Sequence, residues 1–176
     1  MTTFEAPDTL GTPSPIRHRW VETAVGRYLL AATDDALVGV WRQDQAHFPR
    51  PERYGDPADG ASALLDRAEE QLHAYLAGDR EDFDLPLAPA GTAFQQRVWA
   101  RLREIPRGST TTYGDIAREL DAPRAAQAVG AAVGANPLSI VVPCHRVLAG
   151  SGALTGYAGG IDTKRRLLVL ERALPA

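Results

Sequence analysis

The hydrophobic pattern of this chain changes near residue 85, and this change limits the folds that the chain can adopt. Residues 26–42 contain two apolar runs around an Asp-Asp pair, which is typical of a β-hairpin. Residues 61–78 place leucines and alanines on one helical face and end at a glycine. After an acidic, proline-containing linker, the pattern becomes mainly helical. We therefore expect an α/β (α+β) fold, with a β-sheet and helix lobe at residues 20–85 and a helical lobe at residues 91–176.

The N-terminal segment and the overall hydropathy bear on location. Residues 1–19 are rich in proline and threonine and lack the apolar stretch of a signal peptide, so we expect a flexible arm. No later stretch approaches the roughly 20 apolar residues that span a bilayer. The sequence predicts a cytoplasmic protein with no membrane partner.

Charge is distributed unevenly between the two predicted lobes. Residues 1–90 carry 8 Lys and Arg against 16 Asp and Glu, a net charge of -8. Residues 91–176 carry 11 against 6, a net charge of +5. Nucleic acids attract basic surfaces, so the second lobe is the candidate for binding a polyanion.

The second lobe contains two short helical segments in close succession. A capping box, formed by Thr92 and Gln95, starts a preceding core helix. The two segments, residues 112–120 and 123–136, are separated only by residues 121–122, which favours a helix-turn-helix with Pro123 as the first residue of its second helix. That second helix is almost entirely alanine, glycine and valine. Such a helix either packs tightly against a neighbour or closely approaches a narrow minor groove.

The only cysteine lies in "IVVPCHRV", at Cys144. We expect the run before Pro143 to be a strand and the thiol to lie at the strand-to-loop junction. A neighbouring imidazole, oriented by a carboxylate, activates a thiol as a nucleophile, and His145 and Glu171 are the candidates. Taken alone, a single cysteine is more often an inert core residue. One thiol with scattered histidines shows no zinc-ligand spacing, so we expect no metal and no cofactor.

Several motifs occur together in one order: "TAFQQRVWARLREIPRG", "TYGDIA", "AVGAAVGANP", "IVVPCHRV", "LTGYAGG" and "KRRLLVLE". In this order and spacing the chain resembles the O6-alkylguanine-DNA alkyltransferases, also called methylated-DNA-protein-cysteine methyltransferases, over residues 20–172. The resemblance implies a winged-helix-like helix-turn-helix that binds the minor groove of double-stranded DNA as a monomer. It also implies that an O6-alkylguanine, or an O4-alkylthymine, is flipped out and gives its alkyl group irreversibly to the cysteine.

The resemblance assigns roles to five residues. Cys144 would be the alkyl acceptor, with His145 as its water-mediated base and Glu171 as the carboxylate that orients the imidazole. Asn136 would hold the turn before the active-site strand, and Tyr113 would donate to the guanine as it leaves. Taken singly, such residues are usually a turn former, a surface aromatic or a solvated carboxylate.

The resemblance also places two sets of binding residues. The Val147 backbone and the loop of Tyr157, Ala158 and Gly159 would line the base pocket. The candidates for DNA contact are Arg124, Ala126, Gln127, Ala128 and Gly130.

One position departs from the family pattern. Family members usually carry an arginine before the "AVG" triplet, where it occupies the space left by the flipped base, but here the residue is Gln127. Glutamine lacks the charge and planar guanidinium of arginine, although Arg124 lies three residues earlier and is a candidate to compensate. Three alternatives therefore stay open: a lesion sensor that does not transfer the group, an alkyltransferase with a changed substrate, and a Cys-His hydrolase.

Overall fold

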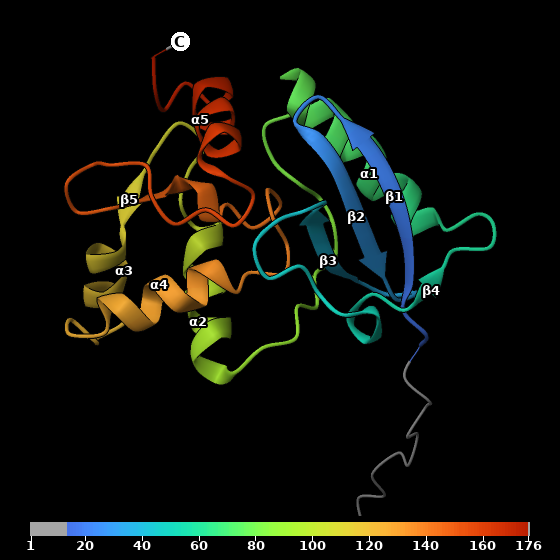
Figure 1. Cartoon of the computed structure of the whole chain (residues 1–176), viewed down its shortest axis with the longest axis horizontal. Coiled ribbons are helices and arrows are strands. Elements are labelled where there is room, and N and C mark those ends of the chain that lie inside the picture. The colour runs from blue at the N-terminus through green and yellow to red at the C-terminus, as the bar shows by residue number, and fades with distance from the viewer. Residues whose placement is uncertain (1–13, 176) are drawn as a thin grey trace, which may run out of the picture.

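The N-terminal lobe is a small, mainly antiparallel sheet with one helix packed against it (Figure 1). The computed structural model describes residues 14–175. The sheet has the order β3-β2-β1-β4, in which β2 pairs antiparallel with both β1 and β3, and β4 pairs parallel with β1. Its strands are β1 (Arg17–Thr23), β2 (Gly26–Ala32), β3 (Leu37–Arg42) and β4 (Asp56–Pro57). The predicted hairpin is thus present as β2 and β3.

Helix α1 (Ala63–Ala77) covers the sheet and leads into the linker. The hydroxyl of Ser62 caps its first turn by accepting from the Leu65 N–H. Gly78 ends the helix at φ +85°, a left-handed conformation that favours glycine. The buried face of α1 contacts the apolar residues of β2, which are almost completely covered.

The C-terminal lobe consists of helices around a short two-stranded parallel sheet (Figure 1). Helix α4 packs against both α2 and α3. The elements of this lobe are α2 (Ala93–Arg103), β5 (Thr111–Thr112), α3 (Tyr113–Glu119), α4 (Ala126–Gly134), the 3₁₀ helix η2 (Cys144–Arg146), β6 (Val147–Leu148) and α5 (Ile161–Leu170). The first lobe also contains a 3₁₀ helix, η1 (Pro51–Arg53). The Thr92 capping box forms as predicted at the start of α2. Within residues 14–175, no helix is long and apolar enough to cross a membrane.

The two lobes share one hydrophobic core and are joined by backbone hydrogen bonds. The edge strand β3 binds the turn after α4, because the Val40 N–H donates to the Pro137 carbonyl over 2.8 Å and the Ser139 N–H donates to the Val40 carbonyl over 3.0 Å. A second link runs from the Ala46 N–H to the Ala158 carbonyl over 3.1 Å. The sheet therefore supports the loops that flank Cys144.

Two predicted boundaries differ from the structure. Strand β1 begins at Arg17, inside the arm predicted for residues 1–19, because residues 17–19 pair with β2; residues 1–13 lie outside the described part of the chain. Helix α4 begins at Ala126 rather than Pro123. The Ala125 N–H donates to the Ala122 carbonyl, which makes Pro123 and Arg124 the centre of a turn.

The strand predicted before Pro143 is also wrong, because residues 139–142 form a turn. The Asn136 amide closes it: its Oδ1 accepts from the Leu138 N–H over 3.0 Å, and its Nδ2 donates to the Val142 carbonyl over 2.9 Å. Ile140 at the centre has φ +71°, which is uncommon for a β-branched residue. A side chain that binds two backbone groups outweighs the strand preference of the apolar run.

A hydrogen bond from Trp99 on α2 to the backbone of α4 contributes to the stability of the fold. The Trp99 indole N–H donates to the Ala132 carbonyl over 2.8 Å in a buried setting. Trp99→Phe removes the donor and leaves that carbonyl unsatisfied, so we expect the free energy of unfolding to fall by about 1–3 kcal/mol. Urea denaturation followed by circular dichroism measures this loss, and an unchanged midpoint would show that the bond contributes nothing.

Candidate active site

Cys144 begins η2 directly after the turn that Asn136 closes. The residue is only 7% exposed, so the thiol that was expected at a strand-to-loop junction is buried. Burial raises the pKa of the Cys144 thiol, while a hydrogen bond from Asn136 and the charge of Lys164 act in the opposite direction. The resting thiol is therefore protonated at neutral pH and needs a base.

His145 lies beside the cysteine in a completely buried position. Its Nε2 lies 2.5 Å from Oε1 of Glu171. An ionised carboxylate only accepts, so Nε2 carries the proton and Nδ1 presents a lone pair. Nδ1 has no hydrogen-bond partner among the protein atoms of residues 14–175. Burial lowers the pKa of His145 more than Glu171 raises it, so the imidazole is neutral and able to accept a proton.

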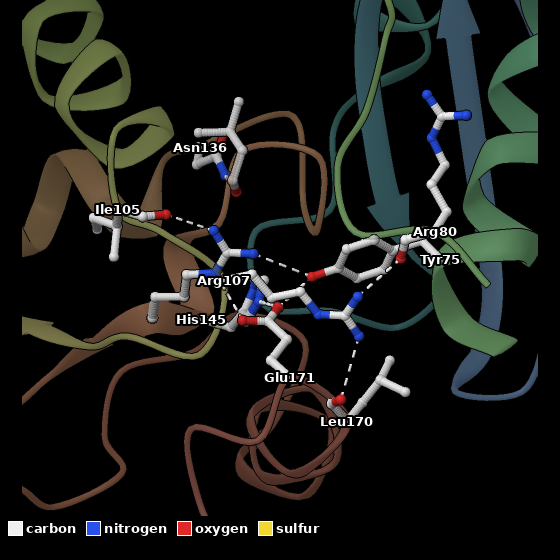
Figure 2. A network of polar contacts seen from close by, with 10 residues as sticks. Tyr75, Arg80, Ile105, Arg107, Asn136, His145, Leu170 and Glu171 are labelled. Carbon is white, nitrogen blue, oxygen red and sulfur yellow. Dashed lines mark hydrogen bonds and ion pairs between the residues drawn. The ribbon is translucent and has the colours of Figure 1, made fainter. Parts of the chain in front are cut away.

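Glu171 lies immediately after α5, as its C-cap residue, and is 3% exposed. Its second oxygen, Oε2, accepts from Arg146 Nε over 2.7 Å, and Oε1 also accepts from the Tyr75 hydroxyl (Figure 2). Burial alone would raise the pKa of Glu171, but the hydrogen bonds from His145, Arg146 and Tyr75 lower it to about 2. The carboxylate is thus ionised at any physiological pH.

Lys164 is a buried cation on the inner face of α5. Its Nζ donates to the Val147 carbonyl over 2.6 Å and to the Thr155 carbonyl over 2.8 Å. Burial lowers the pKa of Lys164 to about 8. The carbonyl of Val147, expected to line the base pocket, is therefore already bound by this lysine, which fixes β6 against the 155–160 loop.

Two tyrosines flank the cysteine on the side of this loop. Tyr113 lies near Gly156, where an added Cβ would come within 2.9 Å of the Tyr113 hydroxyl. Tyr157 has its ring centroid 6.5 Å from that of His145, and Gly159 passes so close that a Cβ there would lie 2.8 Å from the Tyr157 ring. Burial raises the pKa of both phenols, and the charge of Cys144 raises them further. Both hydroxyls therefore stay protonated as hydrogen-bond donors.

A groove of about 700 Å³ opens between α4, the segment after β3 and residues 156–161. On α4 it is lined by Gly130, Ala131, Gly134 and Ala135, and Tyr157 and Ala158 form part of the opposite side. The opposite face of α4 is buried against α2 and α3, so the small residues serve packing and also leave an open surface.

The candidate DNA-contact residues lie at the start of α4. Gln127 and Ala128 are exposed, whereas Ala126 is half-buried and Gly130 lines the groove. Arg124 is exposed but belongs to the preceding turn, so the shared helical face expected for Arg124 and Gln127 is wrong.

The structure joins His145 to Glu171 by a hydrogen bond and places Cys144 directly before His145, after the turn that Asn136 closes. Tyr113, the fifth predicted catalytic residue, lies near Gly156. Sequence reasoning missed Arg146, Lys164 and Tyr75. Lys164 was detectable, because it shares one helical face with Leu167, Leu168 and Glu171, all of which are buried. Tyr75 carried no such signal, since it reads as an ordinary core residue of α1.

The ionised state of Glu171 predicts a pH-dependent stability. Its pKa of about 2 in the folded protein lies below the usual unfolded value of about 4.3, so its stabilisation is present above that value and is lost as the pH falls toward about 2. Glu171→Gln is expected to cost on the order of 3 kcal/mol of unfolding free energy at neutral pH. Urea denaturation at several pH values should show the two proteins converging on acidification. A pH-independent difference would contradict this account.

Comparisons with known proteins agree with this architecture. The family model described as "6-O-methylguanine DNA methyltransferase, ribonuclease-like domain" matches residues 16–89, and the one described as "6-O-methylguanine DNA methyltransferase, DNA binding domain" matches residues 93–173. A methylated-DNA-protein-cysteine methyltransferase of Mycolicibacterium paratuberculosis is 47% identical over 160 residues, which cover 89% of this chain and 93% of the relative. One from Methanosarcina acetivorans is 43% identical, over 85% of this chain and 94% of the relative.

A solved structure shows the same fold. The crystal structure of Mycobacterium tuberculosis OGT in complex with DNA superimposes with a TM-score of 0.80 at 42% sequence identity, covering 89% of this chain and 93% of that one. The fold is thus shared along nearly the whole length of both chains. The chain belongs to the O6-methylguanine DNA methyltransferase family.

Proposed function

We propose that this protein repairs DNA by direct reversal, as a methylated-DNA-protein-cysteine S-methyltransferase that moves an alkyl group from O6 of guanine to Cys144. The observation that carries the proposal is the buried pair Cys144 and His145. The imidazole is hydrogen-bonded to Glu171, and its other nitrogen has no partner within residues 14–175. Membership of the family supports the same reaction. Because the product is a stable thioether, each molecule acts once.

The transfer begins with removal of the thiol proton. The neutral His145 takes it at Nδ1, through a bridging water, and Glu171 stabilises the imidazolium that forms. The thiolate then attacks the alkyl carbon, a sulfur–carbon bond forms and the bond from that carbon to O6 breaks. The electron pair passes into the guanine, where the Tyr113 hydroxyl donates to the developing negative charge.

Presentation of the base follows from the shape of the C-terminal lobe. We place double-stranded DNA along α4, with the small-residue face against the minor groove and the flipped guanine entering between Tyr113 and the 157–159 loop. The net charge of +5 on residues 91–176 supports binding to phosphates. The helix carries few long side chains that reach base edges, so this docking requires no particular sequence.

The second candidate function rests on Gln127, which is exposed at the start of α4. Without the charged, planar group of arginine, the protein stabilises an extruded base less well. In that case the same architecture binds the lesion and transfers slowly, or acts on alkylated bases that are already unpaired.

Mass spectrometry after mixing with duplex DNA that contains one O6-methylguanine tests the main proposal. We expect one added methyl group, located on the peptide that contains Cys144. The Cys144→Ala protein should stay unmodified while still binding the duplex. If the wild-type protein binds the lesion but gains no mass, transfer to Cys144 is wrong and the sensor function holds.

Gln127→Arg tests the second candidate. A charged side chain in the duplex should speed repair of double-stranded DNA by about tenfold, since hydrogen bonds to charged groups are the stronger ones. Repair of the same lesion in a single strand serves as the control and should change little. If the wild-type and Gln127→Arg proteins repair duplex DNA at equal rates, Gln127 does not slow the reaction.

A further inference from the structure

The N-terminal lobe places one side chain in the network behind the cysteine. Tyr75 lies near the end of α1, is 1% exposed, and reaches Glu171 across 96 positions of the chain. Its hydroxyl donates to Oε1 of Glu171 and accepts from Arg146 Nη2 over 3.2 Å (Figure 2). Burial raises the pKa of Tyr75, so the phenol stays protonated and remains a donor. The contact joins a helix of the first lobe to the C-cap of α5.

The oxygen that Tyr75 binds is the same oxygen that His145 binds. Oε1 of Glu171 accepts from both groups, whereas Oε2 accepts from Arg146 Nε. Two donors on one oxygen share its negative charge, so each limits how strongly the other is bound. The Tyr75 hydroxyl is therefore placed to modulate the partner of the catalytic imidazole.

The ring of Tyr75 is held from two sides, which fixes the hydroxyl. Phe83 packs against it with ring centroids 4.8 Å apart, and the Arg107 guanidinium lies over it, 5.4 Å from the centroid. Arg107 also donates to the Arg80 carbonyl over 3.0 Å and to the Leu170 carbonyl over 3.3 Å, beside Glu171 (Figure 2). Loss of the hydroxyl alone leaves these contacts intact.

We propose that Tyr75 is a positioning residue for alkyl transfer, which holds the shared carboxylate oxygen of Glu171 and thereby sets the orientation and proton affinity of His145. This inference rests on the proposed function for its kinetic consequence, but its effect on the imidazole belongs to the protein without DNA. The first lobe then contributes to catalysis as well as to the fold.

The direction of the effect follows from the groups that face His145. These are Cys144 and Arg146 from η2, Lys164 and Glu171 from α5 and its C-cap, and Tyr157 from the loop that precedes α5. Only Glu171 among them carries a negative charge at rest. Removing the Tyr75 donor leaves that charge less dispersed, so it holds a proton on His145 more firmly and raises the pKa of the imidazole. A protonated His145 cannot accept the thiol proton.

Tyr75→Phe is the decisive variant, because it removes one oxygen and keeps the packed ring. We expect NMR titration of the imidazole in the free protein to show a raised pKa for His145. In single-turnover transfer from an O6-methylguanine duplex, we expect the rate near neutral pH to fall about tenfold and the acidic limb of the pH profile to move to higher pH. Affinity for the duplex should not change.

Trp99→Phe is the matched control, because it also removes one buried hydrogen-bond donor, but at the contact between α2 and α4, away from Tyr75 and Glu171. It should lower Tm and leave the pKa of His145 unchanged. The proposal is overturned if Tyr75→Phe leaves both the imidazole titration and the pH profile as in the wild type, or if Trp99→Phe reproduces both shifts. If the wild-type protein transfers no methyl group, the proposed function fails, while the titration of His145 still decides the role of Tyr75.

Discussion

A buried carboxylate determines how the parts of this protein fit together. Glu171 is ionised and almost completely covered, and an uncompensated charge in such a place is strongly destabilising. Its donors come from two separate parts of the chain: Tyr75 from α1 in the first lobe, and His145 and Arg146 from η2 in the second. Only one arrangement of the two lobes satisfies all of them. The interaction that orients the imidazole is thus also one that fixes the first lobe on the second.

The same burial gives the cysteine a conditional reactivity. Because both groups are buried, the thiol holds its proton and the imidazole is neutral, so neither group is charged at rest. The Lys164 cation and the Asn136 amide are the groups that favour the thiolate. Reactivity therefore depends on a proton acceptor and on fixed dipoles inside the protein. Solvent exposure, which the sequence suggested for Cys144, has no part in it.

The sequence predicted local structure well wherever the signal was itself local. The hairpin of β2 and β3, the helix that ends at Gly78 and the capping box at Thr92 follow from short-range rules, and each is present. Residues 139–142 were misassigned as a strand because their shape depends on two hydrogen bonds from Asn136. The Tyr75 contact was out of reach, since nothing near α1 in the sequence indicates what lies beyond the linker.

Helix α4 shows why its composition alone left two interpretations open. Val129, Ala132 and Val133 are buried against the neighbouring helices, and the Trp99 indole holds the Ala132 carbonyl. On the opposite face of α4, the glycines and alanines that line the groove carry little or no side chain, so this face is nearly flat. One side of α4 thus packs against neighbouring helices, and the opposite side is free for close approach to a groove of DNA. A flat face offers a duplex shape and van der Waals contact but few hydrogen bonds to bases. Under the proposed function, selection of a damaged base therefore falls to the residues around Cys144, where His145, Lys164 and Glu171 are buried.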